Sequence, residues 1–235
     1  AAAYGPAEID KGILDALLGS MGVIFFGGLG GNIAGVDARL SRELTDADVS
    51  QYLAGRRRLE RVAIRHTVGM DDRVEGEGGV ADVRENAGAR YFKLKLNGDP
   101  VHDAERLTRI GRELATLPHD YRVTLDANEQ YADLGALGAL VERLERDAAL
   151  RPIASKLLYI EQPMPRDITR QSPLGALARR DFIVDEADDS YDAFSLARAL
   201  GYRGISSKSC KGIYKSVVTA TRAAKWSAAG EKCFV

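Results

Sequence analysis

The sequence predicts an α/β fold in which parallel strands alternate with helices, as in a (β/α)8-type, TIM-like barrel. From residue 60 onward, short apolar runs recur along the chain, and stretches with helical periodicity separate nearly all of them. The ends of successive runs lie 23 to 35 residues apart, the length that a returning helix needs to reach a parallel neighbour. Three of the runs end in a lone carboxylate, and barrels of this type keep their chemistry at the carboxyl ends of their strands.

Ahead of this region, two segments are predicted differently. Apolar residues at helical spacing, with Pro6 as a start signal, predict one amphipathic helix over residues 7–20. The residues that follow this spacing are Ile9, Ile13, Leu14, Leu17 and Leu18. The glycine-dense stretch at 25–32 lacks a preceding strand and the glycine order of a phosphate-binding loop, so we expect a turn there.

Six strands are expected, and a seventh begins at the end of the sequence. They are the runs at 60–67, 90–96, 121–126, 156–163, 181–186 and 202–210, with KCFV at 232–235 as the start of the seventh. Helical periodicity is clear at 103–117, 134–150 and 192–200 and weakest at 80–88. Eight strands close such a barrel and typically take about 250 residues. We therefore expect an incomplete barrel.

The composition argues against some classes of partner. Among the 235 residues, 33 basic and 34 acidic side chains are evenly mixed, so no basic surface for nucleic acid or for a membrane is expected. The chain has two cysteines, no secretory signal and no apolar run of the roughly 20 residues that span a bilayer. These features predict a cytoplasmic protein, and we also expect a homo-oligomer.

Three acidic residues close three of the apolar runs. Asp126 follows RVTL, Glu161 follows LLYI and Asp185 follows FIV. Carboxylate oxygens are the ligands that Mg²⁺ prefers, and they also suit Mn²⁺. One acid at a strand end is more often a helix cap or a turn residue. Three in the same position predict a Mg²⁺ site, with Mn²⁺ as a second candidate ion.

Lysines flank this predicted metal site. Lys93 and Lys95 lie two residues apart on one strand, so their side chains point to the same face, which is the interior in a barrel. Neighbouring amines lower each other's pKa, which makes one of them a usable base. Lys208 ends the sixth strand, on the opposite wall of a barrel of eight. The alternative for the pair is an edge strand with both lysines in solvent.

Five motifs follow one another at these strand ends. They are K-x-K (Lys93, Lys95), D-A-N (Asp126, Asn128), E-Q-P (161–163), D-E (Asp185, Glu186) and K-S-C-K-G (208–212). Their order and spacing closely resemble the enolase superfamily, specifically its mandelate racemase and muconate lactonizing enzyme branch. The resemblance covers roughly residues 7–230 and departs at the sixth strand, where many relatives have K-x-x-K-x-G-G. It implies that residues 1–32 are a capping-domain remnant with its connecting helix, and that 33–235 form the barrel domain.

The resemblance implies an enzyme that uses Mg²⁺ to remove the proton α to the carboxylate of a small substrate and to stabilise the enediolate that forms. A racemase, an epimerase, a cycloisomerase and a dehydratase all begin in this way, so both isomerase and lyase activities remain open. The roles it implies are metal binding for Asp126, Glu161 and Asp185, proton transfer for Lys95 and Lys208, and pKa depression with substrate contact for Lys93. Asn128 and Glu186 match neighbouring motif positions and would support the metal ligands.

Other residues have two possible roles each. Lys211 is the alternative to Lys208, although its position past the strand end predicts a loop or a first helical turn. His66 closes the first strand and would contact the substrate, but a lone histidine there is more often a structural group. Asp188 and Asp189 are expected to cap the following helix.

Two other functions fit parts of the pattern. A Schiff-base aldolase also uses a strand lysine in a barrel, but it has no use for three metal-binding acids. A non-catalytic barrel that keeps its metal for stability would act as a binding protein. Trapping with borohydride tests the first alternative, and exchange of a substrate α-proton tests the second.

Overall fold

The computed structural model describes residues 4–80, 82 and 88–235, and it divides into two compact units. The sheet unit comprises residues 62–187 and 200–202, and the helical unit comprises the chain up to residue 61 together with 188–199 and 203–235. The expected domain boundary after residue 32 lies inside the helical unit and stays a prediction. The helix expected at 80–88 falls mostly outside the described residues.

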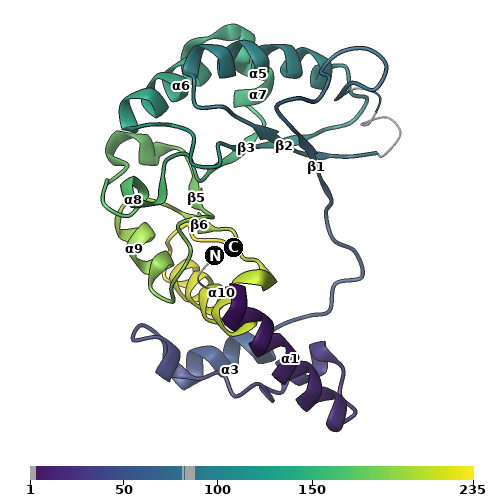
Figure 1. The fold of residues 1–235 in the computed structure, drawn as a ribbon, viewed down its shortest axis with the longest axis vertical. Coiled ribbons are helices and arrows are strands. Elements are labelled where there is room, and N and C mark those ends of the chain that lie inside the picture. The colour runs from purple at the N-terminus through teal and green to yellow at the C-terminus, as the bar shows by residue number, and fades with distance from the viewer. Residues whose placement is uncertain (1–3, 81, 83–87) are drawn as a thin grey trace. The chain divides into compact units, whose positions relative to one another are not determined.

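The sheet unit contains five parallel strands, adjacent in chain order, among its described residues. They are β1 (Arg65–Val68), β2 (Tyr91–Lys95), β3 (Arg122–Asp126), β4 (Leu157–Glu161) and β5 (Phe182–Val184). Between them lie α5 (Pro100–Ala115), α6 (Leu134–Arg146), η2 (Ala148–Leu150), α7 (Arg151–Ala154), α8 (Arg166–Thr169) and η3 (Gly175–Arg179). Helices α5, α6 and α7 cover one face of strands β1 to β3 (Figure 1). The predicted alternation of parallel strands and helices is confirmed.

The alternation of side chains along β2 separates the two faces of this sheet. Phe92 and Leu94 are completely buried. Lys93 and Lys95 point to the opposite face, because successive side chains of a strand alternate. The β2 strand therefore contributes its apolar residues to the core and its two lysines to the other side of the sheet.

A close backbone contact holds the loop after β2. Gly98 has a φ of +89°, and a Cβ at this position would lie 2.3 Å from the carbonyl oxygen of Gln130.

We expect Gly98→Ala to lower the free energy of unfolding by roughly 2 kcal/mol or more, measured by urea unfolding. Gly138→Ala, inside α6, is the matched control, since its Cβ would meet only Leu177 at 4.0 Å. We expect this control to be stabilising by up to about 1 kcal/mol. Equal stability of Gly98→Ala and the wild type would contradict the contact.

The helical unit is built mainly from helices that enclose their own apolar core. Its elements are α1 (Tyr4–Ser20), α2 (Phe25–Gly30), η1 (Ala38–Leu40), α3 (Asp46–Ala54), α9 (Ala193–Ala199), β6 (Gly204–Ile205), η4 (Ser209–Lys211) and α10 (Ile213–Ala228). Val49, Leu53 and Val218 lie at the centre of the core. Gly204 forms a parallel bridge to Phe234, which agrees with the start of a further strand at KCFV. No helix in the described parts of the chain is long and apolar enough to cross a membrane.

The turn predicted at residues 25–32 is wrong for most of its length. Residues Phe25–Gly30 form the short helix α2, and the turn follows at 31–34. A Cβ at Gly28 would lie 2.2 Å from Leu18 Cδ2, so the missing side chain lets α2 pack closely on α1. This packing outweighs the low helix propensity of glycine.

Two other elements differ from their predicted extents. The helix expected at 7–20 begins at Tyr4, and it leaves Ile9 and Ile13 more than 60% exposed (64% and 62%). Its predicted apolar stripe is thus wider than the face that is buried. Strand β1 begins at Arg65, later than the predicted start at residue 60.

The expected caps of α9 are also wrong. Asp188 and Asp189 lie too far ahead of α9, which begins at Ala193. The buried Asp188 carboxylate instead lies 2.8 Å from the ammonium of Lys215 on α10. A buried carboxylate needs a countercharge more than a helix end needs a cap.

Candidate active site

The carboxyl ends of three neighbouring strands bring lysines and acids onto one face of the sheet. In the strand register, Lys95 on β2 lies opposite Asp126 on β3, and Asp126 lies opposite Glu161 on β4. Lys93 precedes Lys95 by two residues and therefore shares its face. The grouping predicted from the strand ends is present for these four residues.

The Lys93 ammonium lies between two carboxylates. Its Nζ is 2.5 Å from Asp126 Oδ2 and 2.9 Å from Glu161 Oε2. The Nζ of Lys95 donates to the same Asp126 oxygen at 2.6 Å. Both carboxylates are fully buried, whereas the Lys95 side chain retains 26% of its exposure. Lys95 is thus the more accessible of the two amines.

Burial and neighbouring charges shift the pKa values of Glu161 and Lys93. Burial raises the pKa of the Glu161 carboxyl, and the nearby charge of Asp126 raises it further, against the lowering effect of Lys93. Burial lowers the pKa of Lys93, but hydrogen bonds to the two carboxylates outweigh this and raise it above its usual value. Glu161 Oε1 is buried without a hydrogen-bond partner among the described residues. Two ammonium groups thus face the two buried carboxylates, and Oε1 is a Glu161 oxygen that they leave without a described hydrogen bond.

A hydrogen-bonded chain continues from Lys95 to the β5 end of the sheet. The Lys95 ammonium donates to Asn128 Oδ1, and Asn128 Nδ2 donates to Glu186 Oε1 at 2.9 Å. The backbone of Asn128 is left-handed, with a φ of +44°, and its N–H donates to Asp126 Oδ1 at 3.0 Å. Asn128 thus contacts both Lys95 and Asp126, and Glu186 contacts Asn128; the supporting role of these two residues stays a prediction.

The third predicted ligand, Asp185, directly follows β5 and is buried. Its charge contributes to the raised pKa of Glu161. Across residues 4–80, 82 and 88–235, however, no three His, Cys, Asp or Glu side chains are grouped as a metal site. The Lys93 ammonium lies between Asp126 and Glu161 in this arrangement. Metal binding by the three acids stays a prediction.

Two further residues reach the cluster and were missed by the sequence analysis. Arg65 Nη1 on β1 donates to the hydroxyl of Tyr159 at 2.6 Å and lies 3.8 Å from Glu161 Oε2. Tyr159 precedes Glu161 by two residues on β4, and this spacing is the signal that would have placed it on the same face. Only the strand register shows that Arg65 shares this face: Thr67 lies opposite Lys93, and Arg65 precedes Thr67 by two residues on β1.

His66 is not brought to the cluster. It lies opposite Phe92 in the register, on the other face of the sheet from Lys93. Its ring meets that of Phe92 edge-on, with the centroids 6.1 Å apart. The choice between a structural role and substrate contact for His66 stays a prediction.

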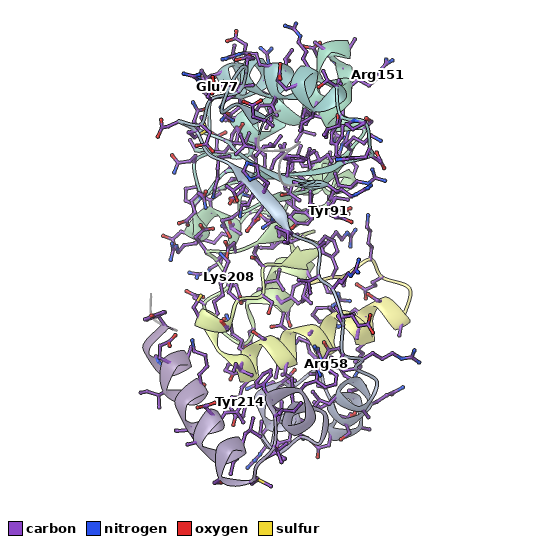
Figure 2. The ribbon with its side chains drawn as sticks, turned by 90° about the vertical axis from the view of Figure 1, so that its right-hand side faces the viewer. Arg58, Glu77, Tyr91, Arg151, Lys208 and Tyr214 are labelled. Atoms are coloured by element: carbon purple, nitrogen blue, oxygen red, sulfur yellow. The ribbon has the colours of Figure 1, made fainter. Side chains whose placement is uncertain are left out.

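The two lysines of K-S-C-K-G belong to the helical unit. Lys208, labelled in Figure 2, lies between β6 and η4. Lys211 Nζ donates to the carbonyl oxygen of Ser206 at 2.9 Å and lies 3.5 Å from Asp188 Oδ2. These contacts tie Lys211 to its own loop, and the choice of Lys208 over Lys211 as the reactive lysine stays a prediction. The position of Lys208 opposite Lys95 stays a prediction.

Comparison with known proteins gives matches among solved structures. No family model matches the chain, and no curated protein matches it. A dipeptide epimerase from Methylococcus capsulatus, complexed with Mg and the dipeptide L-Arg-D-Lys, is 28% identical, with a TM-score of 0.54. The match covers 70% of this chain and 44% of that one.

Two other solved structures are similar at lower identity. N-succinyl Arg/Lys racemase from Bacillus cereus is 21% identical, with a TM-score of 0.59, over 77% of this chain and 47% of that one. Muconate lactonizing enzyme from Pseudomonas putida is 21% identical, with a TM-score of 0.54, over 76% and 51%. The chain therefore spans about half the length of the solved structures that it matches. In its fold, the chain is therefore similar to enzymes of the enolase superfamily, in its mandelate racemase and muconate lactonizing enzyme branch.

Proposed function

We propose that this chain carries the catalytic strand ends of a Mg²⁺-dependent enzyme that removes the proton α to the carboxylate of a small substrate. One observation carries the proposal: Lys93 and Lys95 lie 2.5 to 2.9 Å from acids at the ends of the adjacent strands. A weakly acidic proton can be removed only if a base and a stabiliser of the developing charge act on the same molecule. The similar epimerase, racemase and lactonizing enzyme support this reading.

The residues present fit a Mg²⁺ ion. Asp126, Glu161 and Asp185 offer carboxylate oxygens, the donors that this hard cation prefers. The buried Glu161 Oε1, unpartnered in the described part of the chain, is an oxygen that a cation would satisfy. When bound, the ion supplies positive charge for the oxygens of the substrate carboxylate. Mn²⁺ suits the same donors.

The lysines divide the remaining tasks. Lys95 is the proposed acid/base group, because its side chain is accessible and its ammonium is oriented by Asp126 and Asn128. Lys93 is more buried and bridges two acids, so we assign it to holding the cluster and to contacting the substrate carboxylate. Lys208 is the proposed acid/base group for the other face of the substrate, on the basis of its motif.

Exchange of a substrate α-proton for solvent deuterium, followed by NMR, tests the proposed function. The full-length protein is incubated with hydroxy acids, sugar acids, N-acyl amino acids and dipeptides, in Mg²⁺ and then in EDTA. We expect exchange of at least one class, loss of exchange in EDTA and recovery with Mg²⁺. Exchange that EDTA leaves unchanged would contradict the metal's role. Metal binding without exchange of any class would favour the binding protein, and covalent trapping with borohydride would favour the aldolase.

A further inference from the structure

The side chain of Gln162 links the carboxyl ends of β4 and β5. Its Oε1 accepts hydrogen bonds from the backbone N–H groups of Asp185 at 2.8 Å and Ala187 at 3.0 Å. Its Nε2 donates to the carbonyl oxygen of Met164 at 2.9 Å and to Thr169 Oγ1 at 3.1 Å. The side chain has no exposed surface. Both lone pairs and both N–H groups of the amide are thus used.

The backbone of Gln162 extends the link to a third strand. Its N–H donates to the carbonyl oxygen of Ile183 on β5 at 2.9 Å, and its carbonyl oxygen accepts from the N–H of Glu129 at 2.9 Å. Glu129 follows β3 within three residues of Asp126. Gln162 therefore makes hydrogen bonds to the chain beyond both neighbouring strands, and each of these strands presents a carboxylate of the cluster.

The backbone conformation of Gln162 shows that its neighbours hold it in place. Its φ is +35°, in the left-handed region that residues with a side chain seldom adopt. Such a conformation persists only where the surrounding contacts over-determine it, and it occurs preferentially at functional sites. Asn128 and Glu129, after β3, are also left-handed, with φ values of +44° and +71°. The unusual conformations thus gather at the two strand ends that carry Asp126 and Glu161.

We propose that Gln162 is a positioning residue that sets the relative placement of Glu161 and Asp185 for metal binding. Glu161 immediately precedes Gln162 in the chain, and the backbone N–H of Asp185 donates a hydrogen bond to the amide oxygen of Gln162. A rigid separation of the two carboxylates lowers the cost of gathering them around one ion. This inference rests on the proposed function, since it concerns the predicted metal ligands.

A purely structural role would give a different result from a positioning role. If Gln162 only satisfies buried polar groups, every variant that destabilises this region should weaken metal binding in proportion to its loss of stability. If it positions Asp185, the loss should be specific to its amide oxygen. Thr169 provides the matched control, because its buried hydroxyl bonds the same amide from the nitrogen side and donates to Met164 O at 3.0 Å.

The test compares Mn²⁺ dissociation constants, measured by EPR of free Mn²⁺, for full-length wild type, Gln162→Met and Thr169→Val. Gln162→Met conserves volume and removes the amide oxygen, so we expect a 10- to 100-fold weaker affinity. Thr169→Val keeps the hydrogen bonds from the N–H groups of Asp185 and Ala187 to the amide oxygen of Gln162. We therefore expect the Mn²⁺ dissociation constant of this variant to change by less than about threefold. Urea unfolding measures the free energy of unfolding of each variant. It shows whether the two variants lose a comparable amount of stability, so that a difference in Mn²⁺ affinity cannot be attributed to stability.

A third variant keeps the test decisive if Gln162→Met does not fold. Gln162→Glu loses the NH₂ donor but still presents an oxygen to both N–H groups, so its Mn²⁺ affinity should equal or exceed that of the wild type. A tenfold loss in Gln162→Glu, or equal losses in Gln162→Met and Thr169→Val, would overturn the positioning role alone. Wild-type protein that binds no Mn²⁺ would overturn the proposed function together with this inference.

Discussion

Replacing Lys95 with alanine is expected to reduce exchange of the α-proton of one substrate enantiomer by about 10²–10⁴-fold. Its ammonium is held by Asp126 and Asn128 and is accessible, which are the properties of a group that moves a proton at a fixed place. Mn²⁺ affinity should remain, because Lys95 supplies no ligand to the ion. Enantiomer-resolved deuterium exchange by NMR, with the substrate found in the exchange screen, measures the effect.

Lys208→Ala is the partner variant in this experiment. If Lys208 serves the other face of the substrate, it should lose exchange of the opposite enantiomer, and both variants should lose racemisation. In a one-base elimination or cycloisomerisation, Lys208→Ala should instead weaken exchange and turnover together. Lys156→Ala is the control, since Lys156 pairs with Asp120 just ahead of β4, at the far end of that strand. Wild-type exchange of both enantiomers in Lys95→Ala would refute the assignment of the base.

Removing a predicted metal ligand should have the largest effect on binding. We expect Asp126→Asn to weaken Mn²⁺ affinity by more than about 100-fold, above the 10- to 100-fold loss typical of residues that only support a ligand. The substitution keeps the shape of the side chain and removes the charge from a fully buried position. Titration calorimetry with Mg²⁺ or Mn²⁺ measures the change.

Asp103→Asn is the matched control for this loss. Asp103 is also a buried carboxylate, but it accepts from the Tyr131 hydroxyl at 2.6 Å and from the N–H groups of Asn97 and Gly98. We expect it to lower stability and to leave metal affinity within a few fold. Asp126→Asn protein with wild-type affinity would exclude Asp126 as a ligand and would leave the predicted site with two acids.

The local sequence pattern was sufficient to predict the sheet and part of the site. Apolar runs that end in Lys95, Asp126 and Glu161 predicted parallel strands with these residues at their ends, and the register confirms their grouping. This succeeded because strand periodicity and the common direction of parallel strands determine which side chains share a face and an edge. The position of Lys93 beside two acids follows from the same rule.

The tertiary structure decided what depends on contacts between distant segments. The helix α2 forms where glycines suggested a turn, because Gly28 packs on Leu18. The meeting of Arg65 with Tyr159, 94 residues apart, requires the register of four strands. The hydrogen bond from the Asp185 N–H to the Gln162 side chain depends on how the ends of β4 and β5 lie relative to each other. Propensity and periodicity are local properties, whereas these contacts are selected by packing across the whole sheet.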